Sequence, residues 1–390
     1  MTAPRIEIDV AKIERNTRIL VERLSLVGIR VTGITKAVLG SPGVAAAMLR
    51  GGASGLGDSR VLNLDRLDGL IGSPPRTLIR SPMLSQVGQV VAVSDLSLNT
   101  EAAVLAALDA AAGAARRTHG VVLMVELGDL REGIACEDLP EAVCVVLGHP
   151  WLRLAGLGAN LACRSGVVPD DRNMGVLSGL VERVEALHGI TLDVISGGNS
   201  ANLSWALNTD DVGRVDELRL GEAILLGVDP LYRTPIPGLH TDAFSLAAEV
   251  IEVAMKPVQP WGVRAQAAFG EAPVRTGSGA VRQAILALGR QDVDLDGLRP
   301  PPGMAILGMS SDHVIVDLGD HALAVGDEID FGVGYGALVR AMTSPFVAKM
   351  EFDASLGTPR HLDRHRRDQE RVRAGGAGRG AANAVTAPHS

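Results

Sequence analysis

The chain has 390 residues, of which 46% are hydrophobic and 21% charged, and its formal net charge at pH 7 is −8. This length and apolar content can supply a large buried core, so they exclude a protein that is mainly disordered. Aromatic residues make up only 3% of the chain. Together with the negative charge, this argues against a nucleic-acid surface built from stacked aromatic side chains, and we expect no nucleic-acid partner.

Neither a membrane-spanning helix nor a secretion signal is visible in the sequence. No run of about 18 uninterrupted apolar residues occurs, and the opening segment, MTAPRIEIDV, lacks the basic-then-apolar pattern of a signal peptide. We therefore expect a cytoplasmic protein without a membrane partner. The cysteines, Cys136, Cys144 and Cys163, show no CxxC spacing, which favours reduced thiols and predicts no metal site.

Between residues 29 and 235, short apolar or Gly-rich runs alternate with helical patterns, which is typical of βα units around a parallel sheet. Eight runs are predicted strands: VTGITK (31–36), ASGLGDS (53–59), RTLIRS (76–81), DLSLN (95–99), VVLMVEL (121–127), LAGLGANL (154–161), LDVISGG (192–198) and ELRLGEAIL (217–225). Because eight parallel strands close a TIM barrel, we predict an α/β fold with a (β/α)8 barrel over residues 11–237.

After the barrel the pattern changes to β-rich segments without long amphipathic helices. The predicted strands there are FSLAAEVIEVAM (244–255), AILGM (305–309), HVIVDLG (313–319), DEIDFG (327–332) and YGALVRAM (335–342). They predict a mostly-β C-terminal domain over residues 238–357, and we expect the N-terminal strand, residues 4–10, to pair with it. Residues 358–390 are rich in Arg, Gly and Ala without apolar periodicity, which predicts a disordered tail.

Lys36 ends the first predicted strand, in a chain with only four lysines. The working residues of a TIM barrel lie at such C-terminal strand ends. An ammonium is costly to bury there, so the lysine is either paired with acids, such as Asp58 or Glu126, or used as a neutral amine. A neutral lysine forms a Schiff base with a carbonyl compound, and pyridoxal 5'-phosphate (PLP) is the commonest cofactor held in this way.

The segment SGGNSAN (196–202), after the seventh predicted strand, suits the phosphate of such a cofactor. Its glycines allow close backbone approach, and Asn199 and Ser200 can cap a helix whose free N–H groups attract an anion. The backbone of Gly221 and Glu222, on the eighth predicted strand, can add further donors.

Arg219 lies inside the same apolar strand and needs an acceptor. A pyridine nitrogen is one possibility, and an ion pair with Glu222 or Glu126 is the other. An arginine would leave a pyridine nitrogen unprotonated and the cofactor a weak electron sink. That arrangement suits proton exchange at an α-carbon better than decarboxylation or elimination.

These segments resemble the alanine/ornithine racemase family of fold-type III PLP enzymes, with the closer similarity to the ornithine racemase branch. The resemblance covers about residues 4–352 and rests on motifs in the family's order: ITKAVLG, VELGDLREG, GANLAC, SGGNSANL, LRLGEAILLG, LGMSSDHVIVD and GDEIDFGVGYGALVRAMTSPFV. It implies that Lys36 forms the internal aldimine and acts as base on one face of the substrate Cα. It also implies that Arg219 contacts the pyridine nitrogen and that Arg131 lies near the phenolic oxygen.

The resemblance assigns the phosphate to Ser200, to the backbone of Gly221 and Glu222, and to Tyr335 from the β domain. It implies that the SSDH segment (310–313) is contributed by a partner subunit near the substrate carboxylate. The expected state is therefore a homodimer with shared active sites. Ser311 and Asp312 are the candidate substrate-binding residues of that segment.

Three positions depart from the pattern of alanine racemase. Phe269 stands where that enzyme has its second catalytic base, a tyrosine, Met124 replaces a carbamylated lysine, and Asn160 replaces a histidine that stacks on the ring. The second base must then be another residue. Cys163 is preferred over His313 and Ser311, because a thiol near the cofactor can titrate low enough to act; the alternative for Cys163 is a small core residue.

The predicted function is PLP-dependent racemisation of ornithine or another basic amino acid, by proton abstraction from Cα of an external aldimine. Asp129, Glu132, Asp312 or an acid of the partner chain are candidates to bind the ω-ammonium. One alternative is a PLP-dependent aldolase, dehydratase or decarboxylase of the same fold, whose metal-dependent relatives would need a zinc site. The other is a PLP carrier without turnover, a reading that the missing tyrosine motivates.

Overall fold

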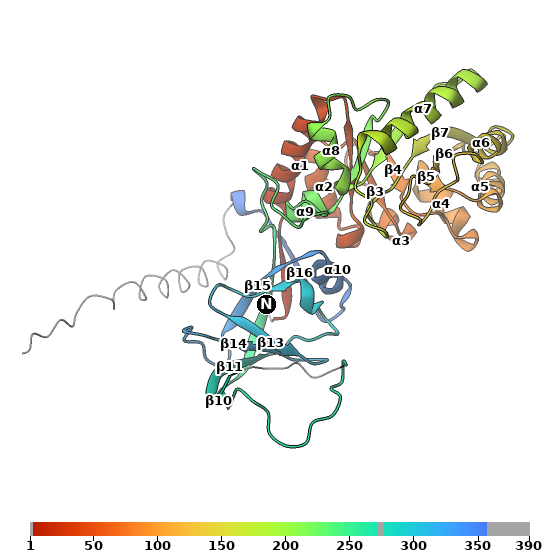
Figure 1. The fold of residues 1–390 in the computed structure, drawn as a ribbon. Coiled ribbons are helices and arrows are strands. Elements are labelled where there is room, and N and C mark those ends of the chain that lie inside the picture. The colour runs from red at the N-terminus through yellow and green to blue at the C-terminus, as the bar shows by residue number, and fades with distance from the viewer. Residues whose placement is uncertain (1–2, 271–276, 357–390) are drawn as a thin grey trace, which may run out of the picture.

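The computed structural model describes residues 3–270 and 277–356, so the predicted disordered tail, residues 358–390, lies outside the described residues. The described chain has two parts (Figure 1). One is a barrel of strands surrounded by helices, and the other is a sheet domain that lies below the barrel in this view. The predicted fold class is confirmed in its barrel and in its C-terminal sheet domain.

All eight predicted barrel strands are present and parallel. Each pairs with the next along the chain, and β9 pairs with β2 to close the barrel. Their bounds are β2 (Arg30–Ile34), β3 (Gly55–Asp58), β4 (Arg76–Leu78), β5 (Leu96–Asn99), β6 (His119–Met124), β7 (Leu152–Gly158), β8 (Val194–Gly198) and β9 (Glu217–Leu220).

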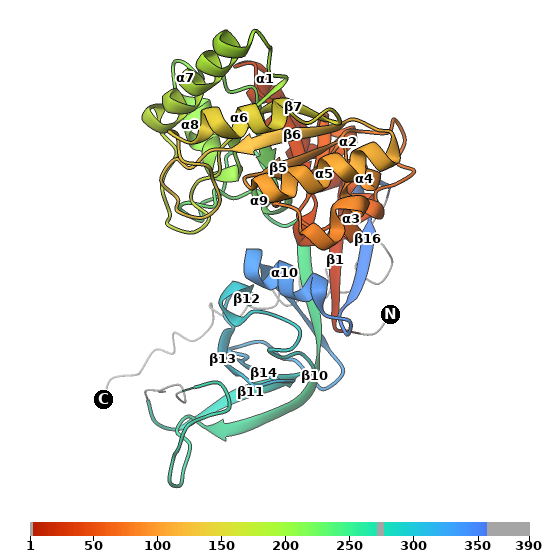
Figure 2. The same cartoon turned by 90° about the vertical axis from the view of Figure 1, so that its right-hand side faces the viewer.

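Helices follow the strands and cover the outside of the barrel (Figures 1 and 2). They are α1 (Val10–Ser25), α2 (Pro42–Arg50), α3 (Val61–Asp65), α4 (Val87–Val93), α5 (Ala102–Ala115), α6 (Leu139–Leu147), α7 (Asp171–His188), α8 (Leu203–Asn208) and α9 (Glu222–Leu226). Short 3₁₀ helices, η1 (Lys36–Val38) and η3 (Ser200–Asn202), begin close to the ends of β2 and β8. Within the described residues, none of the helices combines the length and apolar character needed to cross a membrane.

Capping side chains fix where helices begin. Asp9 Oδ1 accepts a hydrogen bond from Ala11 N at 3.1 Å, which starts α1 directly after β1 (Arg5–Asp9). Ser41 Oγ accepts from Val44 N at 3.2 Å at the start of α2. Asp9 is the last residue of β1 and Ser41 follows η1, so the two caps set where α1 and α2 begin.

The C-terminal domain is built on an eight-stranded sheet. Six strands lie in the order β12-β15-β10-β11-β14-β13, and β1 pairs antiparallel with β10 and parallel with β16. The long strand β10 runs from the barrel side of this domain to its far end (Figure 2). The strand bounds are β10 (Phe244–Pro257), β11 (Ala280–Leu286), β12 (Leu298–Arg299), β13 (Ala305–Met309), β14 (Val314–Asp317), β15 (Glu328–Val333) and β16 (Ala348–Phe352). This domain also contains the short 3₁₀ helices η4 (Leu295–Gly297) and η5 (Ala354–Leu356), whereas η2 (Leu84–Gln86) belongs to the barrel.

Two predicted strands are wrong in part or in whole. The strand predicted over 217–225 ends at Leu220, because the chain turns at Gly221 into α9. The segment predicted as a strand over 335–342 is instead the helix α10 (Tyr335–Thr343). Its buried side chains recur at the helical spacing i, i+1, i+4, i+5, and this period, not that of a strand, decides the element; they are Ala337, Leu338, Ala341 and Met342.

Candidate active site

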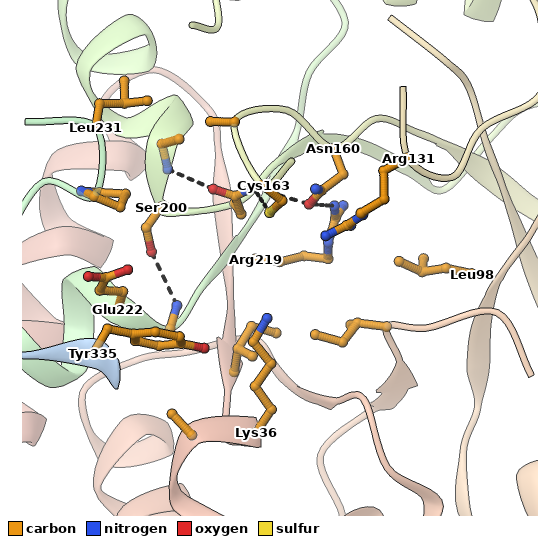
Figure 3. Close-up of a pocket in the computed structure, with 18 of the residues that line it drawn as sticks. Lys36, Leu98, Arg131, Asn160, Cys163, Ser200, Arg219, Glu222, Leu231 and Tyr335 are labelled. Carbon is orange, nitrogen blue, oxygen red and sulfur yellow. Dashed lines mark hydrogen bonds between the residues drawn. The ribbon is translucent and has the colours of Figure 1, made fainter. Parts of the chain in front are cut away.

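A cavity of about 330 Å³ lies at the C-terminal ends of the barrel strands (Figure 3). This volume is in the range of small-ligand pockets. Eleven residues singled out from the sequence line it together: Lys36, Arg131, Glu132, Asn160, Cys163, Asn199, Ser200, Arg219, Gly221, Glu222 and Tyr335.

Lys36 enters the cavity from η1, just past the strand predicted to contain it. Neither acid considered as a structural partner holds it. Asp58 accepts hydrogen bonds from Thr35 Oγ1 at 2.8 Å and from Asn63 Nδ2 at 3.0 Å, and Glu126 accepts from backbone N–H groups of the loop after β6. Among the described residues, Nζ of Lys36 has no hydrogen-bond or ion-pair partner, so it is free for chemistry in the cavity.

Three hydrogen-bond acceptors hold the guanidinium of Arg219. Its Nη1 donates to Ser196 Oγ, and its Nη2 donates to Ala159 O at 2.8 Å and to Asn160 Oδ1 at 3.5 Å. Burial lowers the pKa of the Arg219 guanidinium, since only 4% of the residue is exposed. Nε and the second N–H of Nη1 donate to no described residue, and they are therefore the donors that a ligand in the cavity can use.

Hydrogen bonds from the side chain of Asn199 hold the loop that follows β7. Its Nδ2 donates to Asn160 Oδ1 at 3.1 Å, to Leu161 O at 2.9 Å and to Cys163 Sγ at 3.5 Å, while its Oδ1 accepts from Ala201 N at 2.8 Å. Asn160 Nδ2 is buried and has no partner among the described residues. A buried amide N–H without an acceptor is costly, which points to a ligand group or water that satisfies it.

The hydroxyl of Ser200 organises the turn between β9 and α9. It accepts hydrogen bonds from Gly221 N at 3.3 Å and from Ala223 N at 3.2 Å. Tyr335 reaches the same side of the cavity from the start of α10, so the C-terminal domain contributes to a pocket of the barrel. Burial, reinforced by the nearby Glu222 carboxylate, raises the pKa of Tyr335 to about 12, so the phenol is a proton donor at neutral pH.

Two ion pairs border the cavity. Arg131 forms a bidentate pair with its neighbour Glu132. Burial opposes the charge of Arg131, but Glu132 and the adjacent Cys163 outweigh it and raise the pKa of the guanidinium. Glu222 pairs with Arg233, and not with Arg219 as considered from the sequence. Burial raises the pKa of Glu222, with Arg233 and the nearby Lys36 as opposing influences.

The SSDH residues do not line this cavity. Ser311, Asp312 and His313 lie in the turn between β13 and β14. Asp312 Oδ1 accepts a hydrogen bond from Gln291 Nε2 at 2.7 Å, and His313 Nδ1 lies 3.5 Å from Ser310 Oγ.

Phe269 also lies outside the cavity. Its ring lies under the Arg290 guanidinium, 4.9 Å from ring centroid to Cζ, and it lines a separate groove of about 640 Å³ in the C-terminal domain. Met124 is buried in a small apolar cluster with Leu98 and Val122, so no polar group replaces the lysine of alanine racemase at that place.

Sequence reasoning missed much of the cavity wall. Leu98 and Ile34 lie on barrel strands, where alternation makes every second side chain face inward, and that period was the available signal. Arg233, in the loop after α9, gave no signal. The lining residues not singled out are Ile34, Ala37, Ile79, Leu98, Ala162, Ala201, Pro230, Leu231 and Arg233.

Comparison with known proteins decides the family. Residues 8–230 match the family described as alanine racemase, N-terminal domain. The chain belongs to this family. It is 35% identical to lysine racemase of Thermotoga maritima, over 90% of this chain and 99% of the relative, and 34% identical to ornithine racemase of Acetoanaerobium sticklandii, over 89% and 99%. The chain is therefore an amino-acid racemase, and the relatives match the branch predicted from its motifs.

Solved structures of the family share the fold. Alanine racemase from Streptomyces coelicolor A3(2) superposes with a TM-score of 0.72 at 20% identity, over 89% of this chain and 97% of the other. Alanine racemase from Bartonella henselae, with covalently bound pyridoxal phosphate, superposes with a TM-score of 0.68 at 17% identity, over 90% and 100%. The racemase described here belongs to a PLP-dependent family.

The cavity residues fit PLP. Lys36 has an unpartnered amine for the aldehyde, Arg219 Nε and the buried Asn160 Nδ2 are donors without described acceptors, and the Tyr335 phenol is protonated. Basic residues outnumber acidic ones along the wall, as a phosphate requires. Among the described residues, no group of three or more His, Cys, Asp or Glu side chains is arranged to hold a metal ion.

Proposed function

We propose that this racemase interconverts the L- and D-forms of a basic amino acid, ornithine or lysine, with PLP bound covalently to Lys36, as a homodimer in the cytoplasm. The observation that carries the proposal is the amine of Lys36, which has no partner in the described chain and shares a cavity with Arg219, Ser200 and Tyr335. The two relatives named above, a lysine and an ornithine racemase, support the substrate class.

Each side of the cavity holds a different part of the cofactor in this proposal. Ser200 Oγ, the backbone of Gly221 and Glu222, and the Tyr335 phenol bind the phosphate, where a neutral phenol donates a hydrogen bond. Arg219 faces the pyridine nitrogen with the N–H group left free by its other contacts.

The remaining cavity residues hold the ring from its other edges. Arg131, kept charged by Glu132, lies at the phenolic oxygen. Asn160 and Asn199 border the ring, and the unpartnered Asn160 Nδ2 gains an acceptor when the cofactor binds.

When bound, PLP withdraws electrons from the substrate α-carbon and so acidifies its C–H bond. Lys36 Nζ takes or returns the proton on one face of Cα. Arg219 keeps its own proton, because guanidinium is a very weak acid, and leaves the pyridine nitrogen without one. A cofactor held in this way would be a weaker electron acceptor, which would favour return of the proton to Cα over elimination or decarboxylation.

Cys163 is the proposed acid and base on the opposite face. It lies across the cavity from Lys36 in Figure 3, after β7, and Asn199 Nδ2 lies 3.5 Å from its sulfur. The Arg131 guanidinium lies beside it and lines the same cavity. His313 from a second copy of the chain is the second candidate for this role.

Glu132 is the favoured partner of the substrate ω-ammonium. Of the three acids of this chain considered from the sequence, Asp129 accepts hydrogen bonds from Arg164 N and Ser165 N at 3.0 Å, and Asp312 lies outside the cavity. Glu132 lines the cavity and has a partly exposed carboxylate. It can therefore accept an ammonium beside its bond to Arg131.

A second copy of the chain accounts for the residues that lie away from their own cavity. Asp312 and His313 are exposed and Ser311 is half-buried, and apolar side chains such as Leu295, Ile306 and Met309 line the groove with Phe269. An exposed Trp261, in the segment after β10 that also contains Phe269, adds apolar surface. In the proposed homodimer these residues meet the partner, and the SSDH turn approaches the partner's substrate carboxylate.

The experiment compares the wild type with Lys36→Ala and, as matched control, Lys256→Ala, at a half-buried lysine that is paired with Glu252 and does not line the cavity. We expect a visible absorption band that borohydride removes, and a mass adduct on the peptide that contains Lys36. Racemisation of ornithine and lysine, followed by chiral chromatography, should fall at least about a thousandfold in Lys36→Ala and stay unchanged in Lys256→Ala.

Substantial racemisation by Lys36→Ala would refute the assignment of the lysine. A strong preference for alanine or serine in a panel of L-amino acids would refute the basic substrate. Hydrogen exchange at Cα in deuterated water excludes a pure PLP carrier, and release of an aldehyde or of carbon dioxide would identify an aldolase or a decarboxylase instead.

A further inference from the structure

A buried acid close to Arg219 on β9 has no part in the proposed function. Glu217 precedes Arg219 by two residues on β9, so both side chains point to the same side of the strand. Glu217 is 9% exposed and does not line the cavity. Strand β9 lies between β2 and β8, with Thr32 opposite Arg219 on one side and Ser196 opposite Glu217 on the other.

Hydroxyl groups of both neighbouring strands bind this carboxylate. Thr32 Oγ1 lies 2.5 Å from Glu217 Oε1, and Ser196 Oγ lies 2.5 Å from Glu217 Oε2. An ionised carboxylate only accepts, so each hydroxyl gives its single proton to Glu217. Ser196 Oγ is then left with lone pairs alone, and it accepts the N–H of Arg219 Nη1. The direction of every bond in the chain Arg219 to Ser196 to Glu217 is thereby fixed.

The guanidinium needs this anion. Arg219 is buried, and a buried charge without a counter-charge is costly. The other acids near it are engaged elsewhere, because Glu132 pairs with Arg131 and Glu222 with Arg233. Glu217 is the acid that most favours the charged form of Arg219 and so raises its pKa against the effect of burial.

The same bonds set the orientation of the guanidinium plane. Nη1 is held by Ser196, and Nη2 by Ala159 O and Asn160 Oδ1. With both terminal nitrogens anchored on the barrel, the Nε–H and the second N–H of Nη1 remain as donors without a described acceptor. The hydroxyl of Ser196 therefore helps to set the orientation in which Arg219 offers these donors to the cavity.

We propose that Glu217 is a positioning residue that acts through Ser196 to hold Arg219 charged and oriented toward the pyridine nitrogen of the cofactor. This inference rests on the proposed function, since it requires PLP on Lys36. Loss of the Glu217 charge loosens the guanidinium and changes the electronic environment of the bound cofactor. Substrate binding groups at the cavity wall are left in place.

The test uses the full-length, PLP-loaded protein with Glu217→Gln, which keeps the shape and removes the charge. We expect the kcat for ornithine to fall at least about tenfold with KM within about threefold, because a charge-assisted bond is lost from the relay and not from the substrate. The visible absorption maximum of the bound cofactor should shift, and the PLP dissociation constant should rise. The last two readouts do not depend on turnover.

Two variants of Ser196 and one of Thr32 separate positioning from folding. Ser196→Ala breaks the relay but leaves the Thr32–Glu217 bond, so it should reproduce the spectral shift, and Ser196→Thr should restore the wild-type spectrum. Thr32→Val removes the other hydroxyl on the same carboxylate, and it should lower the melting temperature without moving the absorption maximum.

A wild-type spectrum and kcat in Ser196→Ala or in Glu217→Gln would overturn the inference, and so would an equal spectral shift in Thr32→Val. If Glu217→Gln does not fold, the comparison of the absorption spectra of Ser196→Ala and Ser196→Thr tests the inference by itself. Failure of the proposed function looks different, because the borohydride adduct on Lys36 would then be missing already in the wild type.

Discussion

Lys36 follows the first strand of the barrel and Arg219 lies on the last, and the pairing of β2 with β9 brings the two side chains into one cavity. Lys36 ends in a free amine, whereas Arg219 is anchored by three acceptors. One residue can therefore move with a proton while the other stays fixed. The two side chains share one cavity only because the barrel closes, since Lys36 and Arg219 are far apart along the chain.

The assignment of Cys163 predicts a large loss of rate without loss of cofactor. Cys163→Ala should lower kcat by about a hundredfold or more, because general acid or base groups contribute that much, while the PLP absorption band remains. Cys144→Ala, at an exposed cysteine of α6, is the matched control. Full activity in Cys163→Ala together with loss in His313→Ala would transfer the role to His313.

The barrel was predictable because its signals are local. Each strand is a short apolar run between turn signals, and even the polar run around Ser97 pairs on both sides as β5. Lys36 and Ser200 were identifiable because each closely follows the end of a barrel strand, β2 and β8 respectively. The prediction of a strand through residue 225 is wrong from Gly221 onward. The short apolar segment there is compatible with a strand or a helix, and tertiary packing determines that it is a helix.

The partners of the site residues were not predictable, because they come from other strands. The bond from Arg219 to Ser196 requires the register of β8 and β9, which no sequence period specifies. In the same way, Arg131 and Glu132 are neighbours in sequence, yet only the fold shows that both border the cavity. Sequence patterns therefore indicated many of the residues that line the cavity, and packing shows which groups those residues contact.

Tyr335 is expected to contribute to cofactor affinity at all physiological pH values. Burial raises the pKa of its phenol to about 12, so the donor form persists from pH 6 to pH 9. Tyr335→Phe should raise the PLP dissociation constant about tenfold across this range. Tyr232→Phe, at an exposed tyrosine, should leave the constant unchanged. A loss in Tyr335→Phe that disappears above pH 8 would contradict a phenol that stays protonated.

His119 should make the protein less stable in mild acid. It is fully buried beside Ser97, with Nε2 2.8 Å from Ser97 Oγ. Burial, with Arg117 adding, lowers the pKa of His119 from 6.5 to about 4. The unfolded chain then binds a proton that the folded chain does not, so stability is complete above pH 6.5 and is lost as pH falls toward 4.

Urea unfolding of the wild type and of His119→Gln, at pH 7.5 and pH 5, measures this loss. Between the two pH values the wild type should lose about 2 kcal/mol more than the variant, which no longer titrates at this position. The carboxylates contribute equally to both proteins and cancel in the comparison. Equal losses would mean that His119 takes up its proton in the folded state as easily as in the unfolded one.

Glu132 should control the choice between basic and small substrates. Its carboxylate lines the cavity next to Arg131, so an ω-ammonium can bind it without displacing a buried group. Glu132→Gln keeps the size of the side chain and removes its charge. We expect KM for ornithine and lysine to rise about tenfold, the effect of losing one charge-assisted hydrogen bond, and KM for alanine to change by less than about threefold.

The control for Glu132 is Glu137→Gln, the same change at an exposed acid that does not line the cavity. This variant should leave KM for ornithine, lysine and alanine at wild-type values. Alanine separates two ways in which Glu132 can act. If the carboxylate binds the ω-ammonium, alanine is insensitive to its loss, because it has no second ammonium. If Glu132 acts only by holding Arg131, ornithine and alanine lose activity equally, and the ω-ammonium must then be bound by an acid of the partner subunit.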